Sequence, residues 1–158
     1  MRYSMFVVLI LLVGNGCKQN NTVAHGTAPT LSVSNVKDSI LYTFVIPKTV
    51  FGINDTLSAA LTLYNQSIST DTLTMIVGSL YYSGLWTLKD ERGKTFMDGP
   101  KIIPLTLTKV LLASHQSLSD RVIYQVFADS SGALLVAGSY ILQEQIFSVS
   151  LTLNISLQ

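Results

Sequence analysis

The chain has 158 residues, of which 48% are hydrophobic and 12% are charged, so it is not an intrinsically disordered chain and its length fits one domain. Ten Lys and Arg residues nearly balance nine Asp and Glu residues, and this charge gives no electrostatic reason for binding nucleic acid or an anionic membrane surface. The single Cys excludes an internal disulfide framework and a Cys-based metal cluster.

The N-terminus predicts a secretory signal with a lipid anchor. Arg2 precedes an unbroken apolar run at residues 5–13, which is shorter than the ~18 residues that a membrane-spanning helix needs. Small residues then lead to Cys17, an arrangement that resembles the lipobox of bacterial lipoproteins, although Gly14 stands where that motif usually has Leu. The resemblance implies a signal peptide at residues 1–16 and lipidation of Cys17. The alternative is an ordinary cleavage site beside a free thiol.

Residues 17–30 are predicted to be the lipidated Cys and a flexible tether, because they are small, polar and without periodicity. At ~3.3 Å per residue the tether could extend about 40 Å, which would hold a domain at residues 31–158 clear of the lipid headgroups. Lys18 directly follows the Cys and no acidic pair comes after it, which resembles outer-membrane lipoproteins. We therefore expect a lipid-anchored protein of the bacterial cell envelope, at the periplasmic face of the outer membrane.

The rest of the chain shows the two-residue period of strands that bury one face. The residues expected to share inward faces are, in chain order, Ile40, Tyr42, Phe44 and Ile46; Leu57, Ala59, Leu61 and Leu63; Leu73, Met75 and Val77; Trp86 and Leu88; Leu105 and Leu107; Val122, Tyr124 and Val126; Tyr140, Leu142 and Ile146, interrupted by Glu144; and Val149, Leu151, Leu153, Ile155 and Leu157. Loops are expected at residues 51–55 and 65–71, and tight turns at residues 90–93 and 128–132. Short strands without a helical period predict an all-β antiparallel sandwich, with the lone Trp86 in its core.

Three segments resemble BsuPI-type bacterial intracellular proteinase inhibitor domains. Residues 57–67 look like the opening strand of that family, residues 86–96 like its aromatic-x-aliphatic-x-Asp-x-x-Gly hairpin, and residues 138–142 like its Gly-x-Tyr strand start. In the hairpin, Asp90 can accept backbone N–H groups and Gly93 can supply a positive φ, while Asn65 can cap the loop after its strand. The resemblance implies an immunoglobulin-like β-sandwich. The chain departs from the family at Met97, where an aromatic residue is usual, and nothing in it identifies an inhibitory loop.

Candidate catalytic residues are few. Residues 114–120 contain Ser114, His115, Ser117 and Asp120, the residue types of a hydrolytic triad, but closeness in sequence does not provide the geometry of a triad. We expect a polar connector there and no enzymatic activity. The acidic residues are scattered, no phosphate-binding Gly-rich loop leads into a helix, and no metal or cofactor is predicted.

The strongest candidate for a contact surface is residues 80–85, where Tyr81 and Tyr82 follow one another among Gly and Ser. Tyr offers a large contact area at low entropic cost, so Tyr81, Tyr82 and the nearby Trp86 are the predicted partner-binding residues. The alternative is structural, with one Tyr packed inward and the other covering a sheet edge.

These features favour a non-enzymatic envelope lipoprotein whose domain binds a protein partner, with a proteinase as the partner that the family resemblance suggests. One alternative is a structural component of an envelope assembly that docks through edge strands such as residues 149–157. Another alternative is a hydrolase that uses Ser114 or Ser117 with His115.

Overall fold

The computed structural model of the chain describes residues 30–76, 78–100 and 106–158. The expected signal peptide, Cys17 and nearly all of the tether lie outside the described residues, as do Val77 and Leu105. Within the described ranges, no helix has both the length and the apolar character needed to cross a membrane.

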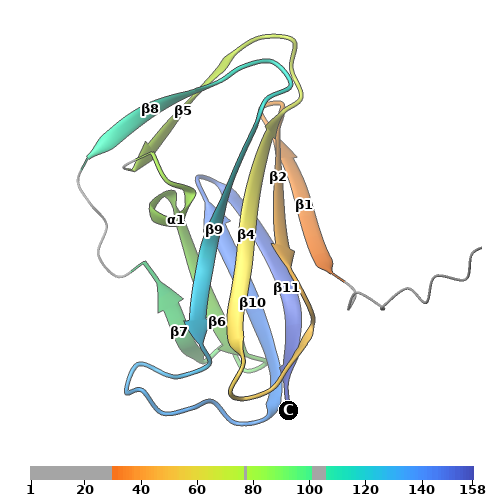
Figure 1. The fold of residues 1–158 in the computed structure, drawn as a ribbon, viewed down its shortest axis with the longest axis vertical. Helices are drawn as coiled ribbons and strands as arrows, with labels where there is room; N and C mark the ends of the chain where they lie inside the picture. The colour runs from red at the N-terminus through yellow and green to blue at the C-terminus, as the bar shows by residue number, and fades with distance from the viewer. Residues whose placement is uncertain (1–29, 77, 101–105) are drawn as a thin grey trace, which may run out of the picture.

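Two sheets face each other and a two-stranded ribbon extends from one end of them (Figure 1). In order across the first sheet the strands are β1 (Leu31–Lys37), β2 (Ile40–Ile46), β4 (Thr56–Asn65) and β9 (Ser117–Val126). Across the second sheet they are β3 (Val50–Phe51), β11 (Val149–Leu157), β10 (Gly138–Ile146), β6 (Gly84–Asp90) and β7 (Thr95–Gly99). The ribbon consists of β5 (Asp71–Ile76) and β8 (Leu107–Leu112), and the short helix α1 (Leu80–Ser83) follows β5. All neighbours pair antiparallel except the short β3, which runs parallel to β11.

The sequence-based prediction of an all-β antiparallel sandwich is confirmed. Strands β2, β4, β6 and β11 bury every second residue, because each has one face toward the other sheet. Trp86 is 1% exposed and belongs to the core, as expected. The five apolar residues of β11 are all buried in the chain's own core, so the apolar face of this last strand is already covered.

Strand β9 does not follow its predicted alternation. Val122 is buried as expected, but Tyr124 is 64% and Val126 54% exposed, whereas Ile123 is buried. The cause is a β-bulge: the pairing with β4 shifts by one residue opposite Ala59 and Ala60. An extra residue in one strand reverses the faces of all residues that follow it.

Two further expectations need correction. Leu107 is 67% exposed, because β8 pairs only with β5 in a ribbon that leaves one face uncovered. Glu144 does not interrupt the inward face of β10; its side chain is 1% exposed and continues that face between Leu142 and Ile146.

The predicted turn chemistry of the β6–β7 hairpin is confirmed. The Asp90 carboxylate accepts hydrogen bonds from the backbone N–H groups of Arg92 (3.0 Å) and Lys94 (2.9 Å). Gly93 has a φ of 83°, a conformation in which a residue without Cβ is not strained. This hairpin places β7 at the edge of the second sheet.

Candidate functional site

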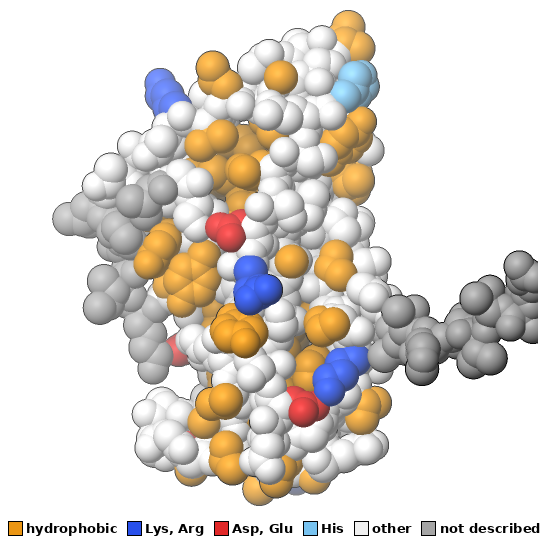
Figure 2. All heavy atoms as spheres, in the orientation of Figure 1, with side chains coloured by type: hydrophobic (Ala, Val, Ile, Leu, Met, Phe, Trp, Pro, Cys, Tyr) orange, Lys and Arg blue, Asp and Glu red, His pale blue; other side chains and the backbone are white. Residues whose placement is uncertain are grey.

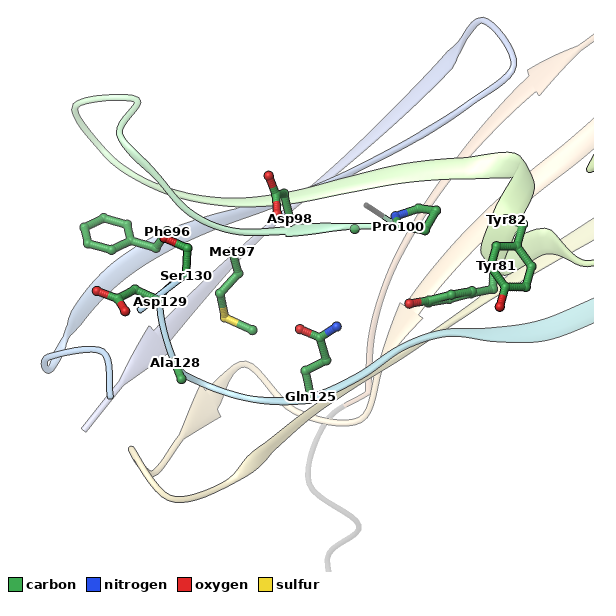
Figure 3. A pocket seen from close by; sticks show the side chains of 11 residues that line it. Tyr81, Tyr82, Phe96, Met97, Asp98, Pro100, Gln125, Ala128, Asp129 and Ser130 are labelled. Atoms are coloured by element: carbon green, nitrogen blue, oxygen red, sulfur yellow. The ribbon is translucent and has the colours of Figure 1, made fainter. Parts of the chain in front are cut away.

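A groove of about 480 Å³ opens where the free edges of the two sheets meet, and we call it the β7–β9 groove (Figure 3). Its lining residues come from α1, from four of the five residues of β7 and the Pro that follows it, from the end of β9 and from the turn after β9. They are Tyr81, Tyr82, Phe96, Met97, Asp98, Gly99, Pro100, Gln125, Ala128, Asp129 and Ser130. The predicted contact residues Tyr81 and Tyr82 therefore both line this groove.

Helix α1 holds the two tyrosines at one end of the groove. The helix is a single turn, and an isolated helix of that length is unstable in water, so its position depends on contacts with its neighbours. Ser79 is the N-cap: its Oγ accepts the Tyr81 N–H (3.2 Å) and donates to Asp120 Oδ2 (2.8 Å) on β9. At the other end Ser83 Oγ donates to Ser79 O (2.9 Å) and accepts the N–H of Ile76 (3.0 Å). The helix is thus tied to both β9 and β5.

Tyr81 and Tyr82 are both half-buried and pack against each other edge to face, with ring centroids 5.0 Å apart and an interplanar angle of 81°. Neither ring lies in the core, and both contribute to the groove wall. The structural alternative, with one ring inside and one over a sheet edge, does not describe this arrangement. The pair forms a fixed aromatic corner with open surface on both rings.

The bulge in β9 provides the middle of the groove. After the bulge, Gln125 points to the inner side of β9 and its side chain faces that of Met97 across the hollow (Figure 3). Simple alternation assigned Gln125 to the outer face, so sequence reasoning missed it as a site residue. A bulge has no reliable sequence signature, since it depends on how the two paired strands fit.

The far end of the groove carries a fixed negative charge. Asp129 Oδ1 accepts hydrogen bonds from Ser131 Oγ (2.6 Å), Ser131 N (2.8 Å) and Ala133 N (3.1 Å), and these bonds hold the pKa of the Asp129 carboxyl below its usual value. Asp98 also lines the groove, and none of the described lining residues is a Lys, Arg or His. The groove thus joins an aromatic end to an acidic end.

The groove also lies beside two free backbone edges. Among the described strands, β7 is the last of the second sheet and β9 the last of the first. The outer edge of a terminal strand has unpaired N–H and C=O groups, to which an extended segment of another chain can add.

Trp86, the third predicted contact residue, lies inside the wall. Its side chain is 1% exposed, and its indole ring lies against Gly99, where a Cβ would be 2.7 Å from Trp86 Nε1. Trp86 therefore supports the wall from behind, and of the three predicted contact residues Tyr81 and Tyr82 are the two that line the groove.

The residues of the hydrolytic hypothesis bond to other partners. His115 Nδ1 is 3.2 Å from Tyr64 Oη, Ser114 Oγ donates to Ser67 O (2.8 Å), and Asp120 accepts the hydroxyl of Ser79. The structure brings none of these three together in a nucleophile–base–orienter arrangement. Within the described ranges, no group of three or more His, Cys, Asp or Glu side chains is placed to hold a metal ion.

No family model matches the chain, and no curated protein matches it. Among solved structures, a β-glucosidase from Erythrobacter marinus is similar at 15% identity and a TM-score of 0.43 over 82% of this chain and 16% of the enzyme. A β-glucosidase from Listeria innocua gives 10% identity and 0.43 over the same shares. The alkylpurine DNA glycosylase AlkC from Pseudomonas fluorescens gives 10% and 0.45 over 72% of this chain and 28% of that protein. The chain spans less than a third of each, and likenesses this distant carry no argument about its function.

Proposed function

We propose that this chain is a non-enzymatic, lipid-anchored protein of the bacterial envelope whose β-sandwich binds an extended segment of a protein partner in the β7–β9 groove. The observation that carries the proposal is the position of the Tyr81–Tyr82 corner: two half-buried rings at one end of a groove between two free strand edges.

The chemistry of the groove suits a peptide better than a small polar metabolite. Main-chain hydrogen bonds to β7 or β9 would give affinity for any extended segment, and side-chain pockets would give specificity. The aromatic corner suits an apolar or planar side chain, while the ionised Asp129 at the far end favours a basic one.

The anchor rests on the sequence. An apolar run at residues 5–13 followed by Cys17 supports lipidation, and a multiply acylated N-terminus holds a protein on a membrane stably. The BsuPI-like segments support an immunoglobulin-like domain and make a proteinase one candidate for the partner. The alternative of docking through residues 149–157 gains no support, because the apolar face of β11 is covered by the chain's own core.

The test is a comparison of variants in affinity recovery from an envelope extract. The double variant Tyr81→Ser/Tyr82→Ser should reduce the recovery of any genuine groove partner about tenfold or more, because aromatic anchors at an interface typically contribute ~2 kcal/mol or more each. Tyr124→Ser is the matched control, since Tyr124 is 64% exposed on the outer face of β9 and does not line the groove.

Both variants should unfold cooperatively, which denaturant unfolding followed by circular dichroism would verify. A partner lost equally from the Tyr124→Ser protein, or recovered undiminished by the double variant, would reject the groove as its binding site. If the specific partner is a proteinase, its activity should be measured in the presence of the purified protein. Inhibition would identify the chain as a proteinase inhibitor, and unchanged activity would identify it as a module that binds without inhibiting.

A further inference from the structure

A carboxyl group lies in the core without a partner. Glu144 on β10 is 1% exposed, and among the described residues neither of its carboxyl oxygens has a hydrogen bond. A buried polar group without a partner typically costs ~1–3 kcal/mol, and more if it is charged. Such a residue calls for a physical explanation beyond packing.

The residue directly opposite Glu144 in the β6–β10 pairing is Trp86, the only Trp of the chain. Trp86 Nε1 is also buried and also has no hydrogen-bond partner among the described residues. A donor and an acceptor thus face the same interior from paired positions, and neither is satisfied.

The carboxyl group touches the junction that carries the tyrosines. A Cβ on Gly84 would lie 1.9 Å from Glu144 Oε1, so only Gly leaves room for the carboxyl there. Gly84 is both the C-cap of α1 and the first residue of β6, and its N–H bonds to Leu80 O. The carboxyl of Glu144 therefore rests on the residue that ends the helix of Tyr81 and Tyr82.

No described charge compensates this carboxyl. Titratable side chains on the described elements around it are Lys89 and Asp90 on β6, Asp120, Arg121 and Tyr124 on β9, Tyr42 on β2, Tyr140 on β10 itself, and Tyr81 and Tyr82 on α1. None of them is hydrogen-bonded to Glu144. On the inward side of the neighbouring β6 and β11 the charged residue is Asp90, the last residue of β6, which pairs with Tyr140 and not with Glu144. Burial alone raises the pKa of Glu144 from its ordinary value of 4.5 to about 7.

We propose that Glu144 is a proton-dependent switch for the β7–β9 groove: the neutral carboxyl allows the α1–β6 junction to close, and the ionised carboxyl opens this junction to water and releases the Tyr81–Tyr82 corner. The switch rests on the proposed function in one respect: the partner segment proposed for the groove is the ligand whose binding the switch would regulate. The opening itself is a property of the chain alone.

Raising the pH shifts the equilibrium from the closed to the open state. The closed state holds the proton more tightly than an open, hydrated state, in which the carboxyl has its ordinary pKa of 4.5. The closed state is therefore fully favoured below pH 4.5. The ratio of closed to open molecules then falls ~10-fold per pH unit as the pH rises. It stops falling above a pH of about 7, where the carboxyl is ionised in both states.

The first measurement is hydrogen exchange of the mature protein in mild detergent, expressed as protection factors so that the intrinsic pH dependence cancels. Between pH 5.5 and 7.5 the backbone amides of residues 80–86 should lose protection about twentyfold. Amides of the β2–β4 pairing, in the other sheet, should keep theirs. Loss of protection in both regions would mean global destabilisation and would overturn the switch, as would no loss in either.

The second measurement uses Trp86 fluorescence, because the chain has no other Trp to obscure it. The wild-type emission should shift with pH up to about 7, where the buried carboxyl ionises. Glu144→Gln, which cannot ionise, should give a flat profile, and Glu91→Gln, in the exposed hairpin turn, should behave as wild type. An unchanged titration in the Glu144→Gln protein assigns the signal to another group and overturns the proposal.

If Glu144→Gln does not fold, Glu144→Met provides a second non-ionising variant of similar length. The hydrogen-exchange result on the wild-type protein stands without either variant. Both measurements are made without a partner, so failure of the switch leaves the pull-down result intact. Likewise, failure of the pull-down leaves the switch testable.

Discussion

Asn65 is completely buried, and its side chain ties three parts of the chain together. Asn65 Nδ2 donates to the carbonyl oxygens of Ser69 (2.8 Å) and Leu112 (2.9 Å). Its Oδ1 accepts from the N–H (2.9 Å) and the hydroxyl (2.7 Å) of Ser67. The amide thus provides hydrogen-bond partners for polar groups of the loop after β4 and for a carbonyl at the end of β8. This explains why a polar residue occupies an inward position.

Replacing Asn65 by Ala should therefore lower the free energy of unfolding by ~2–4 kcal/mol, because the Leu112 carbonyl would be left buried without a partner. Urea unfolding followed by circular dichroism measures the loss. Asn154→Ala, on the exposed face of β11, is the control and should change stability by less than ~0.5 kcal/mol. A loss below ~1 kcal/mol for Asn65→Ala would show that water replaces the amide.

At the scale of one element, β9 shows how a bulge creates a site. Before the bulge, Leu118 and Val122 face inward; after it, Ile123, Gln125 and Phe127 take the inner side. The reversal leaves Tyr124 on the outside, where it stacks with the guanidinium of Arg121 at 4.9 Å. Without the extra residue Gln125 would point away from the groove.

Strand β7 depends on close contact with β6. Gly99 lies so near the indole that a Cβ would be 2.7 Å from Trp86 Nε1 and 2.9 Å from Trp86 Cε2. Gly99→Ala should lower the free energy of unfolding by ~1–3 kcal/mol, because a buried indole ring cannot easily shift. The fluorescence of Trp86 should also change in this variant, because either the indole ring must move or β7 must separate from the ring.

The control for this prediction is Gly52→Ala, where a new Cβ would lie 3.7 Å from the nearest atoms, those of the Asp55 carboxylate, in ordinary contact. We expect a change within ~0.5 kcal/mol there. Equal effects of the two substitutions would mean that helix or strand propensity, and not the indole contact, determines the cost at Gly99.

At the scale of the whole molecule, the N-terminal strand and the groove lie on opposite sides of the sandwich. The chain enters at β1, on the side of the first sheet opposite β9, and the β7–β9 groove lies on the other side. Figure 2 shows charged side chains of both signs scattered over one face, in places next to each other, without a patch of one sign. A protein tethered through β1 would therefore present its groove away from the tether.

The proposed lipid anchor can be tested directly. Removing residues 1–16 from 158 would leave 142 residues beginning with Cys17, and mass spectrometry of the native N-terminus should find this Cys acylated. Cys17→Ser should move the protein out of the membrane fraction or leave it unprocessed. Lys18→Ser keeps the Cys and should remain membrane-bound; equal fractionation of the two variants would reject lipidation at residue 17.

The sequence by itself determined the fold class and most of the strands, because alternating burial is a local, two-residue pattern that any sheet with one covered face imposes. It also determined the Asp90–Gly93 turn, where a side chain and a backbone angle act within four residues. It also indicated Tyr81 and Tyr82 as contact candidates, because two consecutive Tyr residues among Gly and Ser are typical of recognition loops.

Only the tertiary structure decided which faces the chain covers. The bulge at Ala59 and Ala60 depends on the fit of two segments more than sixty residues apart, and it places Gln125 in the groove and Tyr124 on the exposed outer face. The burial of Glu144 opposite Trp86 likewise follows from strand pairing over long sequence distances. Alternation fixes the side of a strand on which a residue lies, but whether that side meets a core, a groove or solvent depends on packing between segments that the local pattern does not contain.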